Sequence, residues 1–441
     1  MKTSFLTEKT DSEILLKIEK FRNALRDFIE NGKISEYNKV AKVRMMIIRE
    51  KYLQEIRPFY DSDLIKIITG IRRCGKSIVL SQIRNELSVK TDNIIYLDFE
   101  DKETETLLPS WKELLAYVEE NRKEGLCYVF LDEIQAVDEW AEAIKTLRLR
   151  NCSVFISGSN SRLLSAEFTD YLSGRYVSFR ICPFVYKELS EYADQLGYEL
   201  TSADYLNWGG FPKRIEFDDS AAQRRYLEDL EETIVFRDII MRNKINKPDE
   251  FRKLANYVFC TNARTFSISS ITEYMNNNGS SVSDKTVKKW MSYLEEAFTI
   301  SHLSLYSVKA KRELNYYYKV YDCDVAFNSL RVFNNRYDLS HNLENIVYNE
   351  LIYMGYHVSV FINNGKEIDF LAEKEGKKYY VQVALSIAEE KPYNREMGAF
   401  EGLSQIDKKI LITNDGNDYS TSNVTHLNFE RFLRLNSLEE I

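Results

Sequence analysis

A glycine-rich loop lies between a short apolar run and a helical pattern, and it is the feature that most constrains the fold. Gly70, Gly75, Lys76 and Ser77 satisfy the pattern G-x-x-x-x-G-K-[ST], with IKIIT before it and SIVLSQIRNEL after it. Glycines let a backbone close around an anion, and the N–H groups at the start of the following helix bind phosphate. The sequence therefore predicts a phosphate-binding loop at residues 70–77 in an α/β domain.

The residues of this loop have expected tasks in binding ATP with Mg²⁺. Lys76 is expected to meet the β- and γ-phosphates, and the Ser77 hydroxyl is expected to be a ligand of the metal ion. The phosphate-binding amides and Lys76 are also expected to lower the pKa of Cys74 and make its thiol reactive. The predicted nucleotide-binding residues are Gly70, Ile71, Arg72, Arg73, Cys74, Gly75, Lys76 and Ser77.

Two carboxylates follow a second apolar run, Tyr128-Val129-Phe130-Leu131. Ligands of open α/β sheets bind at the carboxyl ends of the strands, where Asp132 and Glu133 would lie. We expect Asp132 to hold Mg²⁺ and Glu133 to polarise the attacking water. The alternative is that the two acids only solvate the end of a strand.

The chain divides into segments of different pattern. Residues 1–50 read as a charged helical extension, and residues 51–185 contain apolar runs separated by helices, which is typical of a parallel sheet covered on both faces. Residues 186–248 look helical and form a lid, broken by a turn at residues 208–212. Residues 249–335 predict a winged helix, with a helix around 271–277, a second helix at 284–297 and strands through ISHLSLY and NYYYKVY. Residues 336–441 predict a small α/β domain.

Several motifs taken together carry a resemblance to a known family. The motifs occur in this order along the chain: GIRRCGKS, FLDEIQ, SGSNS, LSGRY, GGFP, EIDF and VQV. They resemble a prokaryotic family of AAA+ P-loop ATPases that end in the domain of unknown function 4143. The resemblance covers residues 48–441, and it implies a winged helix and a C-terminal module similar to restriction endonucleases.

The resemblance also implies roles for three polar residues. Asn160 occupies the position of the residue that senses the γ-phosphate in AAA proteins. Arg175 occupies the position of an arginine that contacts the nucleotide of a neighbouring subunit. This role of Arg175 would require a homo-oligomer. Arg214 is a weaker candidate for a γ-phosphate contact within the same chain. The alternatives are a helix cap or turn for Asn160 and a surface ion pair for Arg175.

The winged-helix segment carries positive charge in an acidic protein. Residues 251–320 contain ten Lys and Arg against five Asp and Glu, whereas the whole chain has a net charge of -8. Lys285, Lys288 and Lys289 fall on the second helix, which would enter a major groove, and Lys309, Lys311 and Arg312 fall near the wing. DNA is thus an expected partner, although a solvated helix face used for packing or dimerisation explains the same charges.

The C-terminal segment matches a nuclease metal centre only in part. The expected pattern is E…D…(E/Q)-x-K, and Glu344, Asp369 and Gln382 occupy its first three positions. The lysine position holds Ala384, and Gln382 stands where a second metal-binding acid would be. We therefore expect no nuclease activity, because the centre lacks the lysine and one of the acids that such chemistry uses.

The remaining composition narrows the class of protein. The six cysteines show no paired spacing and the four histidines do not cluster with them, so we expect reduced thiols and no structural zinc. No run approaches the roughly 20 apolar residues that span a bilayer, which favours a cytoplasmic protein.

The sequence predicts an ATPase that couples its nucleotide state to the later modules. The alternative is a regulatory or assembly module that binds ATP without hydrolysing it.

Overall fold

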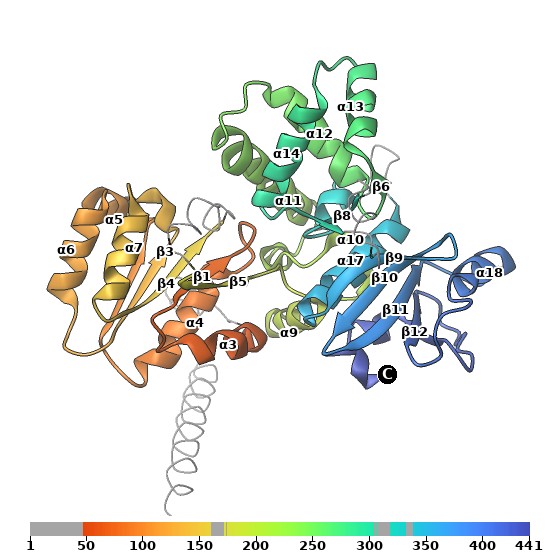
Figure 1. Ribbon diagram of the computed structural model, residues 1–441, viewed down its shortest axis with the longest axis horizontal. Coiled ribbons are helices and arrows are strands. Elements are labelled where there is room, and N and C mark those ends of the chain that lie inside the picture. Colours follow the sequence, from red (N-terminus) through yellow and green to blue (C-terminus); the bar gives the residue numbers. More distant parts are fainter. Residues whose placement is uncertain (1–46, 160–171, 173, 304–305, 307–317, 332–337) are drawn as a thin grey trace, which may run out of the picture. The chain divides into compact units, whose positions relative to one another are not determined.

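Five parallel strands form the first sheet of the computed structural model (Figure 1), which describes residues 47–159, 172, 174–303, 306, 318–331 and 338–441. The order in space is β2-β3-β4-β1-β5, so β4 lies between the strand before the phosphate loop and the strand before Asp132. All five strands are the apolar runs expected from the sequence. They are β1 (Ile65–Thr69), β2 (Ile94–Asp98), β3 (Cys127–Asp132), β4 (Cys152–Gly158) and β5 (Tyr176–Arg180).

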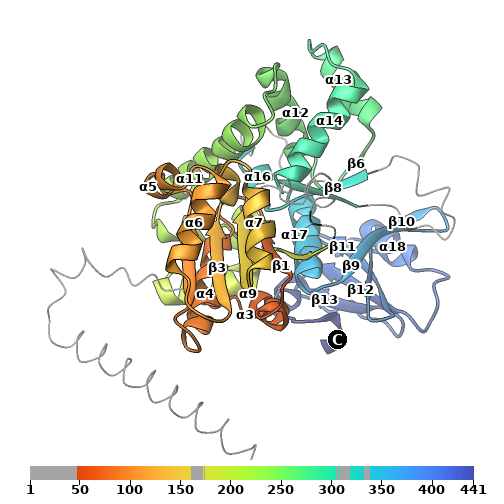
Figure 2. The ribbon, with the colours of Figure 1, turned by 60° about the vertical axis from the view of Figure 1, so that its left-hand side comes forward.

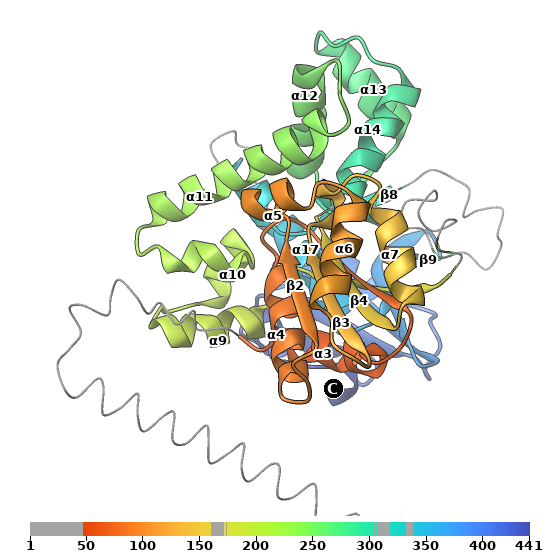
Figure 3. The ribbon, with the colours of Figure 1, turned by 90° about the vertical axis from the view of Figure 1, so that its left-hand side faces the viewer.

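Helices cover both faces of this sheet because alternate side chains of each strand point to opposite sides. On β1, Ile65 and Ile67 pack with the helices α6 (Trp111–Asn121) and α7 (Trp140–Leu149), and Ile68 packs with α3 (Glu50–Ile56) and α4 (Lys76–Ser88). Figure 3 shows β2 with α4 and α6 on its two sides. The phosphate loop is thus held between a buried strand and a buried helix.

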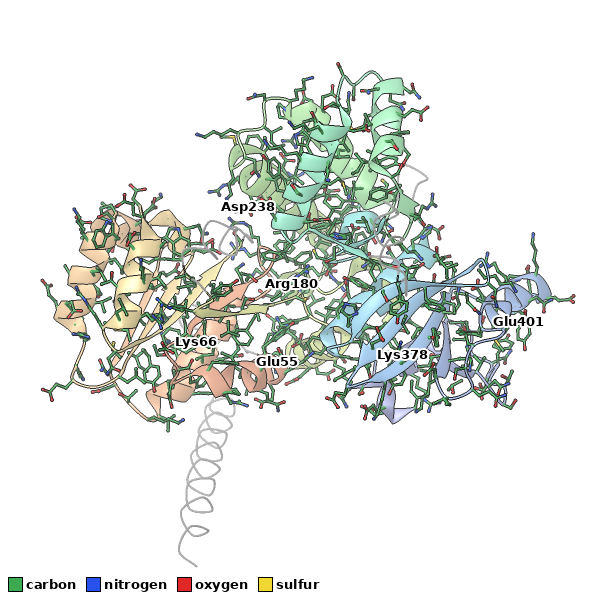
Figure 4. All side chains as sticks on the ribbon, viewed as in Figure 1. Glu55, Lys66, Arg180, Asp238, Lys378 and Glu401 are labelled. Atoms are coloured by element: carbon green, nitrogen blue, oxygen red, sulfur yellow. The ribbon has the colours of Figure 1, made fainter. Side chains whose placement is uncertain are left out.

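A lysine side chain lies inside this sheet. Lys66 on β1 is fully buried (Figure 4), and its ammonium donates hydrogen bonds to Ser153 Oγ at 2.7 Å and to the Ser62 carbonyl at 3.1 Å. It also lies 4.5 Å from the centre of the Phe155 ring. Burial lowers the pKa of Lys66 to about 7, although Asp61 and Asp63 act in the opposite direction.

Lys66 should make the stability of this domain depend on pH. The unfolded chain holds the lysine proton up to its ordinary pKa of about 10.4, so between about pH 7 and 10 it binds more protons than the folded chain. The free energy of unfolding should therefore rise with pH, by at most about 1.4 kcal/mol per pH unit from this group. In thermal unfolding at pH 7, 8.5 and 9.5, wild type should gain stability relative to Lys66→Met as pH rises. Equal pH slopes for the two proteins would contradict the assignment.

The segment after the sheet is helical, as the sequence predicts. It contains α9 (Tyr186–Leu196), α10 (Ser202–Trp208), η4 (Pro212–Glu216), α11 (Ser220–Thr233) and η5 (Ile234–Met241), of which η5 is a π-helix that continues α11. The turn between α10 and η4 begins at Gly209, which has a φ of 65°. Arg214 in η4 is fully buried.

Three helices and a small antiparallel sheet follow. They are α12 (Pro248–Cys260), β6 (Thr265–Phe266), α13 (Ile268–Asn277), α14 (Asp284–Glu296), β7 (Ile300–Leu303) and β8 (Tyr318–Asp322), with the strand order β6-β8-β7. The sequence pattern found α13, α14 and the strands β7 and β8. It missed the two-residue strand β6, which is too short to show a periodicity.

The last sheet has mixed strand directions in the order β13-β12-β11-β10-β9. Side chains of α17 pack on one face of it and side chains of α18 on the other, and Figure 2 shows α17 beside this sheet. The elements are α17 (Leu339–Tyr353), β9 (His357–Asn363), β10 (Lys366–Lys374), β11 (Lys377–Ala384), α18 (Glu390–Ala399), β12 (Lys408–Thr413) and β13 (Thr425–Asn428). The short remaining helices include η1 (Arg57–Phe59), η2 (Ile134–Ala136), α5 (Lys102–Leu107), α16 (Ala326–Ser329), α19 (Phe429–Phe432) and η7 (Leu438–Glu440).

Among the helices of the described residues, none combines the length and the apolar character that a membrane crossing needs.

Candidate nucleotide site

The phosphate loop connects the buried strand β1 to the helix α4. Gly70 has a φ of 146°, and a Cβ atom there would lie 2.2 Å from the carbonyl oxygen of Ile181. Gly75, at the N-cap of α4, has a φ of 103°. Any other residue at Gly70 would push the loop away from the chain that follows β5.

The first turn of α4 is suited to an anion. Gly75 provides no side-chain cap, and no acidic residue lies in this turn. The N–H groups at a helix start carry partial positive charge and lack partners within the helix. Ser77 is exposed in the same turn. The turn therefore fits the phosphate of a nucleotide, and the role of Ser77 as a metal ligand stays a prediction.

Lys76 lies at the centre of the loop. Its ammonium donates hydrogen bonds to the carbonyl oxygens of Gly70 and Ile71, each at 3.2 Å. The carboxylate of Glu133 lies 3.8 Å from the same ammonium, although the two residues belong to different βα units. The fold thus brings together the two side chains that the sequence assigns to phosphate binding and to activation of water.

Asp132 is buried at the end of β3 and is held by two hydroxyl groups. Ser157 donates to its Oδ1 atom, and Tyr96 donates to Oδ2 at 3.1 Å. Ser157 also accepts a hydrogen bond of 3.2 Å from the backbone N–H of Glu133. Ser157 therefore positions both acids, a role made possible because β4 lies beside β3.

A third carboxylate lies at the same edge of the sheet. Asp98, the last residue of β2, pairs in register with Asp132. Burial raises the pKa of Asp98, opposed by its hydrogen bond from Glu100 and aided by the charge of Asp132. The edge therefore carries concentrated negative charge opposite Lys76.

A buried arginine before α3 braces the phosphate loop. Arg49 donates a hydrogen bond of 2.9 Å to the carbonyl of Cys74 and one of 3.0 Å to that of Cys182. Its guanidinium also makes a bidentate ion pair with Glu188 on α9, at 2.6 and 2.9 Å. The sequence pattern placed Arg49 in the N-terminal extension, of which residues 1–46 lie outside the described part of the chain. No local signal distinguished it from the neighbouring basic residues.

The expectation for Cys74 was wrong. The thiol is buried against the loop, and burial raises its pKa, whereas Lys76 and Arg49 act in the opposite direction with smaller effect. The loss of hydration of the thiolate outweighs the nearby positive charge. Cys74 is therefore a packing residue whose thiol is protected from modification.

The two loop arginines differ in environment. Arg73 is exposed, with a left-handed φ of 66°. Arg72 forms a bidentate ion pair with Asp238 of η5, at 2.7 and 3.0 Å, and contacts Glu100 at 3.2 Å. Asp238 is almost fully buried, and Figure 4 marks its place. The phosphate loop is therefore tied to the helical segment that leads into α12.

The three residues that the family resemblance singled out have different outcomes. Asn160 lies outside the described residues. Arg175 is exposed at the start of β5, whereas the phosphate loop adjoins the end of that strand, where Arg180 pairs in register with Thr69. Since a strand rises about 3.3 Å per residue, Arg175 is too far from its own loop to contact a nucleotide there. A contact with a neighbouring subunit stays a prediction.

Arg214 is removed as a candidate for a γ-phosphate contact. It is fully buried, and its guanidinium donates to Gln223 at 3.1 Å, to Asp204 at 2.9 Å and to the Gly209 carbonyl at 3.2 Å. These contacts hold the turn after α10. Its position in GGFPKR serves the fold of the helical segment.

Two family models match the chain. One is described as an AAA domain and matches residues 62–190, and the other is the domain of unknown function 8612 and matches residues 200–334. The motifs had pointed instead to domain 4143. Domain 8612 covers the helical segment from α10 onward and the small antiparallel sheet.

Two proteins are similar to this chain over most of its length. An uncharacterised protein of Haemophilus influenzae is 31% identical over 385 residues, which are 84% of this chain and 94% of that protein. An uncharacterised protein of Methanocaldococcus jannaschii is 30% identical over 379 residues, which are 80% and 82%. Among solved structures, a Walker-type ATPase of Pyrococcus abyssi is 16% identical with a TM-score of 0.46, covering 66% of this chain and 97% of that one. The chain therefore belongs to the family of the Haemophilus and Methanocaldococcus proteins, and it carries a nucleotide-binding AAA domain of the P-loop type followed by the domain of unknown function 8612.

Proposed function

We propose that this protein is a magnesium-dependent ATPase that couples its nucleotide state to a winged-helix module bound to duplex DNA. The observation that carries the first part is the 3.8 Å distance between Glu133 and Lys76. A carboxylate beside the lysine that meets the γ-phosphate is placed to orient and deprotonate a water molecule for attack on that phosphate.

The chain's own residues divide the work of hydrolysis. The backbone of the phosphate loop and Lys76 bind the phosphates, and Ser77 and Asp132 would hold the magnesium ion. When bound, Mg²⁺ neutralises charge that builds up on the β- and γ-phosphates. Ser157 and Tyr96 fix the orientation of Asp132 by hydrogen bonds to its two oxygens.

Two arginines carry the proposed coupling. Arg72 of the phosphate loop pairs with the buried Asp238 of η5. Arg180, at the end of β5, donates a hydrogen bond of 3.2 Å to Ser301 of β7. Figure 4 marks Arg180, which lies next to Thr69 in the sheet and thus close to the start of the loop. A change in the loop on nucleotide binding would be transmitted to the segment 249–335 through these contacts.

The DNA part of the proposal depends on α14. Lys285, Lys288 and Lys289 are exposed on this helix, at the spacing i, i+3 and i+4 that places them on one face. They line a pocket of about 530 Å³ between α14 and the small sheet. The order of elements from α12 to β8 matches a winged helix, in which α14 would be the helix that enters the major groove. Lys309, Lys311 and Arg312, expected near the wing, lie outside the described residues.

The proposal is tested by ATP hydrolysis of the full chain with Mg²⁺, with and without duplex DNA. DNA should raise the turnover rate of wild type. Replacing Lys285, Lys288 and Lys289 with Ala should keep the basal rate and remove the stimulation, because phosphate contacts are lost. The dependence of DNA affinity on salt should also become shallower, by a slope of about 0.9 for each contact removed.

Asp238→Asn separates coupling from DNA binding. This variant replaces the bidentate carboxylate partner of Arg72 with an uncharged amide and leaves its contact with Glu100. It keeps all three lysines of α14, so it should bind DNA with wild-type affinity and show reduced stimulation. Turnover that is unaffected by DNA would contradict the DNA part of the proposal. ATP binding without hydrolysis under all conditions would replace the ATPase with a regulatory or assembly module that holds ATP.

A further inference from the structure

The C-terminal domain contains a partly buried acidic centre that no nucleotide contact explains. Its carboxylates, hereafter the acidic centre, are Glu344 on α17 and Glu367 and Asp369 on β10. They surround the ammonium of Lys319, which comes from β8 of the preceding segment. The distances from Lys319 Nζ are 2.6 Å to Glu344, 2.9 Å to Glu367 and 3.1 Å to Asp369.

Each hydrogen of the ammonium has a carboxylate partner. A lysine ammonium has three N–H donors and no acceptor, and three different carboxylates accept from Lys319. The lysine side chain is only 5% exposed, and those of Glu344 and Asp369 are 11% and 9% exposed, whereas that of Glu367 is 39% exposed. No donor is therefore left to orient a water molecule or a phosphate.

The rest of the centre is satisfied by protein groups. Tyr321 donates a hydrogen bond of 2.7 Å to Glu344, and the backbone N–H of Val383 donates one of 2.9 Å to Asp369 Oδ2. Gln382, in the position of the missing acid, accepts from the Asp369 N–H and donates to Glu396 at 2.7 Å. It joins β10, β11 and α18 and contributes no oxygen to the acidic centre.

We propose that Lys319 is a built-in cation, which occupies the acidic centre in place of a divalent metal ion and fastens β8 to the C-terminal sheet. A metal ion bound by the same three carboxylates would lie where the ammonium lies, because it would have to be within about 2.0 to 2.6 Å of the same oxygens. Two cations cannot share that position.

The competing role for Lys319 is that of the lysine that Ala384 fails to supply in a nuclease centre. That role needs the ammonium beside a metal ion, with a donor free for water or for the phosphate. The geometry excludes it, because all three donors are used and the ammonium is at the centre of the carboxylates. Ala384 itself is buried among apolar side chains.

The charges also favour a retained ammonium. Burial opposes the charge of Lys319, but Asp369, Glu344 and Glu367 together raise its pKa well above the ordinary value. Burial raises the pKa of Glu344, an effect that Asp369 increases and Lys319 reduces. Removing the ammonium would leave Glu344 and Asp369 buried together without a counter-charge, which is costly unless they gain another cation or protons.

The test is binding of Mn²⁺ to the nucleotide-free full chain, measured by the spin-resonance signal of free Mn²⁺ and by thermal unfolding. Wild type should show no Mn²⁺ site that depends on Asp369. Lys319→Ala should unfold at lower temperature, gain one Mn²⁺ site with a Kd of about 10⁻⁵ to 10⁻³ M, and recover stability when Mn²⁺ is added. The added site should disappear in Lys319→Ala with Asp369→Asn.

Lys378→Ala is the matched control, because it removes a lysine of the same domain (Figure 4) that contacts one carboxylate, Glu373 at 3.2 Å, and the Tyr306 hydroxyl at 3.3 Å. It should change neither Mn²⁺ binding nor the response to Mn²⁺. If Lys319→Ala does not fold, Lys319→Gln keeps hydrogen-bond donors without the charge and takes its place. A Mn²⁺ site in wild type that Asp369→Asn abolishes would overturn the proposal, as would variants of Lys319 that fold and gain no site.

Discussion

Replacing Glu133 with Gln is expected to lower ATP turnover by a factor of about 10² to 10⁴, the usual contribution of a positioned general base. Nucleotide binding should survive, because the backbone of the phosphate loop and Lys76 are unchanged. Glutamine has the size of glutamate and cannot accept a proton from water at neutral pH. The measurement is single-turnover hydrolysis together with the Kd of a fluorescent ATP analogue. Loss of binding in parallel with loss of rate would show a role in ground-state affinity.

Glu139→Gln is the matched control for this prediction. Glu139 also has a left-handed backbone, with a φ of 53° against 54° for Glu133, and it is exposed six residues further along the chain. The same chemical change there should leave both rate and affinity unchanged. Lys76→Ala should instead weaken ATP binding, since it removes the ammonium from the centre of the loop. A normal rate in Glu133→Gln would contradict the assignment of the base.

The parts of the nucleotide site that the sequence predicted are those set by local pattern. A buried strand, a glycine-rich loop and a helix follow each other within residues 65–88, so Gly70, Gly75 and Lys76 could be placed without knowing the rest of the fold. Asp132 was found for the same reason, at the end of an apolar run. Local sequence sets these features because neighbours in the chain are also neighbours in space.

The parts that the sequence missed depend on contacts between distant residues. The sequence does not give the order of parallel strands, so the position of β4 beside β3, and with it the contact of Ser157 with Asp132, came only from the structure. Arg49 is paired with a glutamate 139 residues away. Lys319 lies 50 residues before Asp369. A local sequence pattern does not contain contacts between residues that are far apart in the chain. The nuclease pattern therefore placed its lysine at position 384, where this chain has alanine, and did not point to Lys319.

The error on Cys74 has a different cause. The position of Cys74 beside Lys76 in the sequence led us to expect a lowered pKa. The positive charges of Lys76 and Arg49 do lie near the thiol in the structure and do lower its pKa. Burial of the thiol, which the sequence did not reveal, has the larger effect. Whether the pKa of a side chain in the phosphate loop rises or falls therefore depends on whether that side chain is buried. For Cys74, burial depends on how the loop packs against the residues that follow β5.

Gly209→Ala is expected to cost more than about 3 kcal/mol of stability, or to prevent folding altogether. Gly209 has a φ of 65° and a ψ of -158°, a combination that only glycine adopts readily. An added Cβ would lie 1.8 Å from the Oδ1 atom of Asp324. Asp324 cannot simply move, because it is buried and accepts hydrogen bonds from the N–H groups of Gly210 at 2.7 Å and Ala326 at 2.9 Å.

Gly197→Ala provides the control, and a double variant identifies the cause. Gly197 ends α9 with a φ of 68°, and a Cβ there would meet no atom within 4 Å, so its replacement should cost only about 1 to 2 kcal/mol. Combining Gly209→Ala with Asp324→Ala removes the atoms that clash and leaves the backbone strain. In urea unfolding, the double variant should therefore lose less stability than the sum of the two single variants. Additive losses would show that backbone strain alone requires glycine, and that the close contact with Asp324 does not.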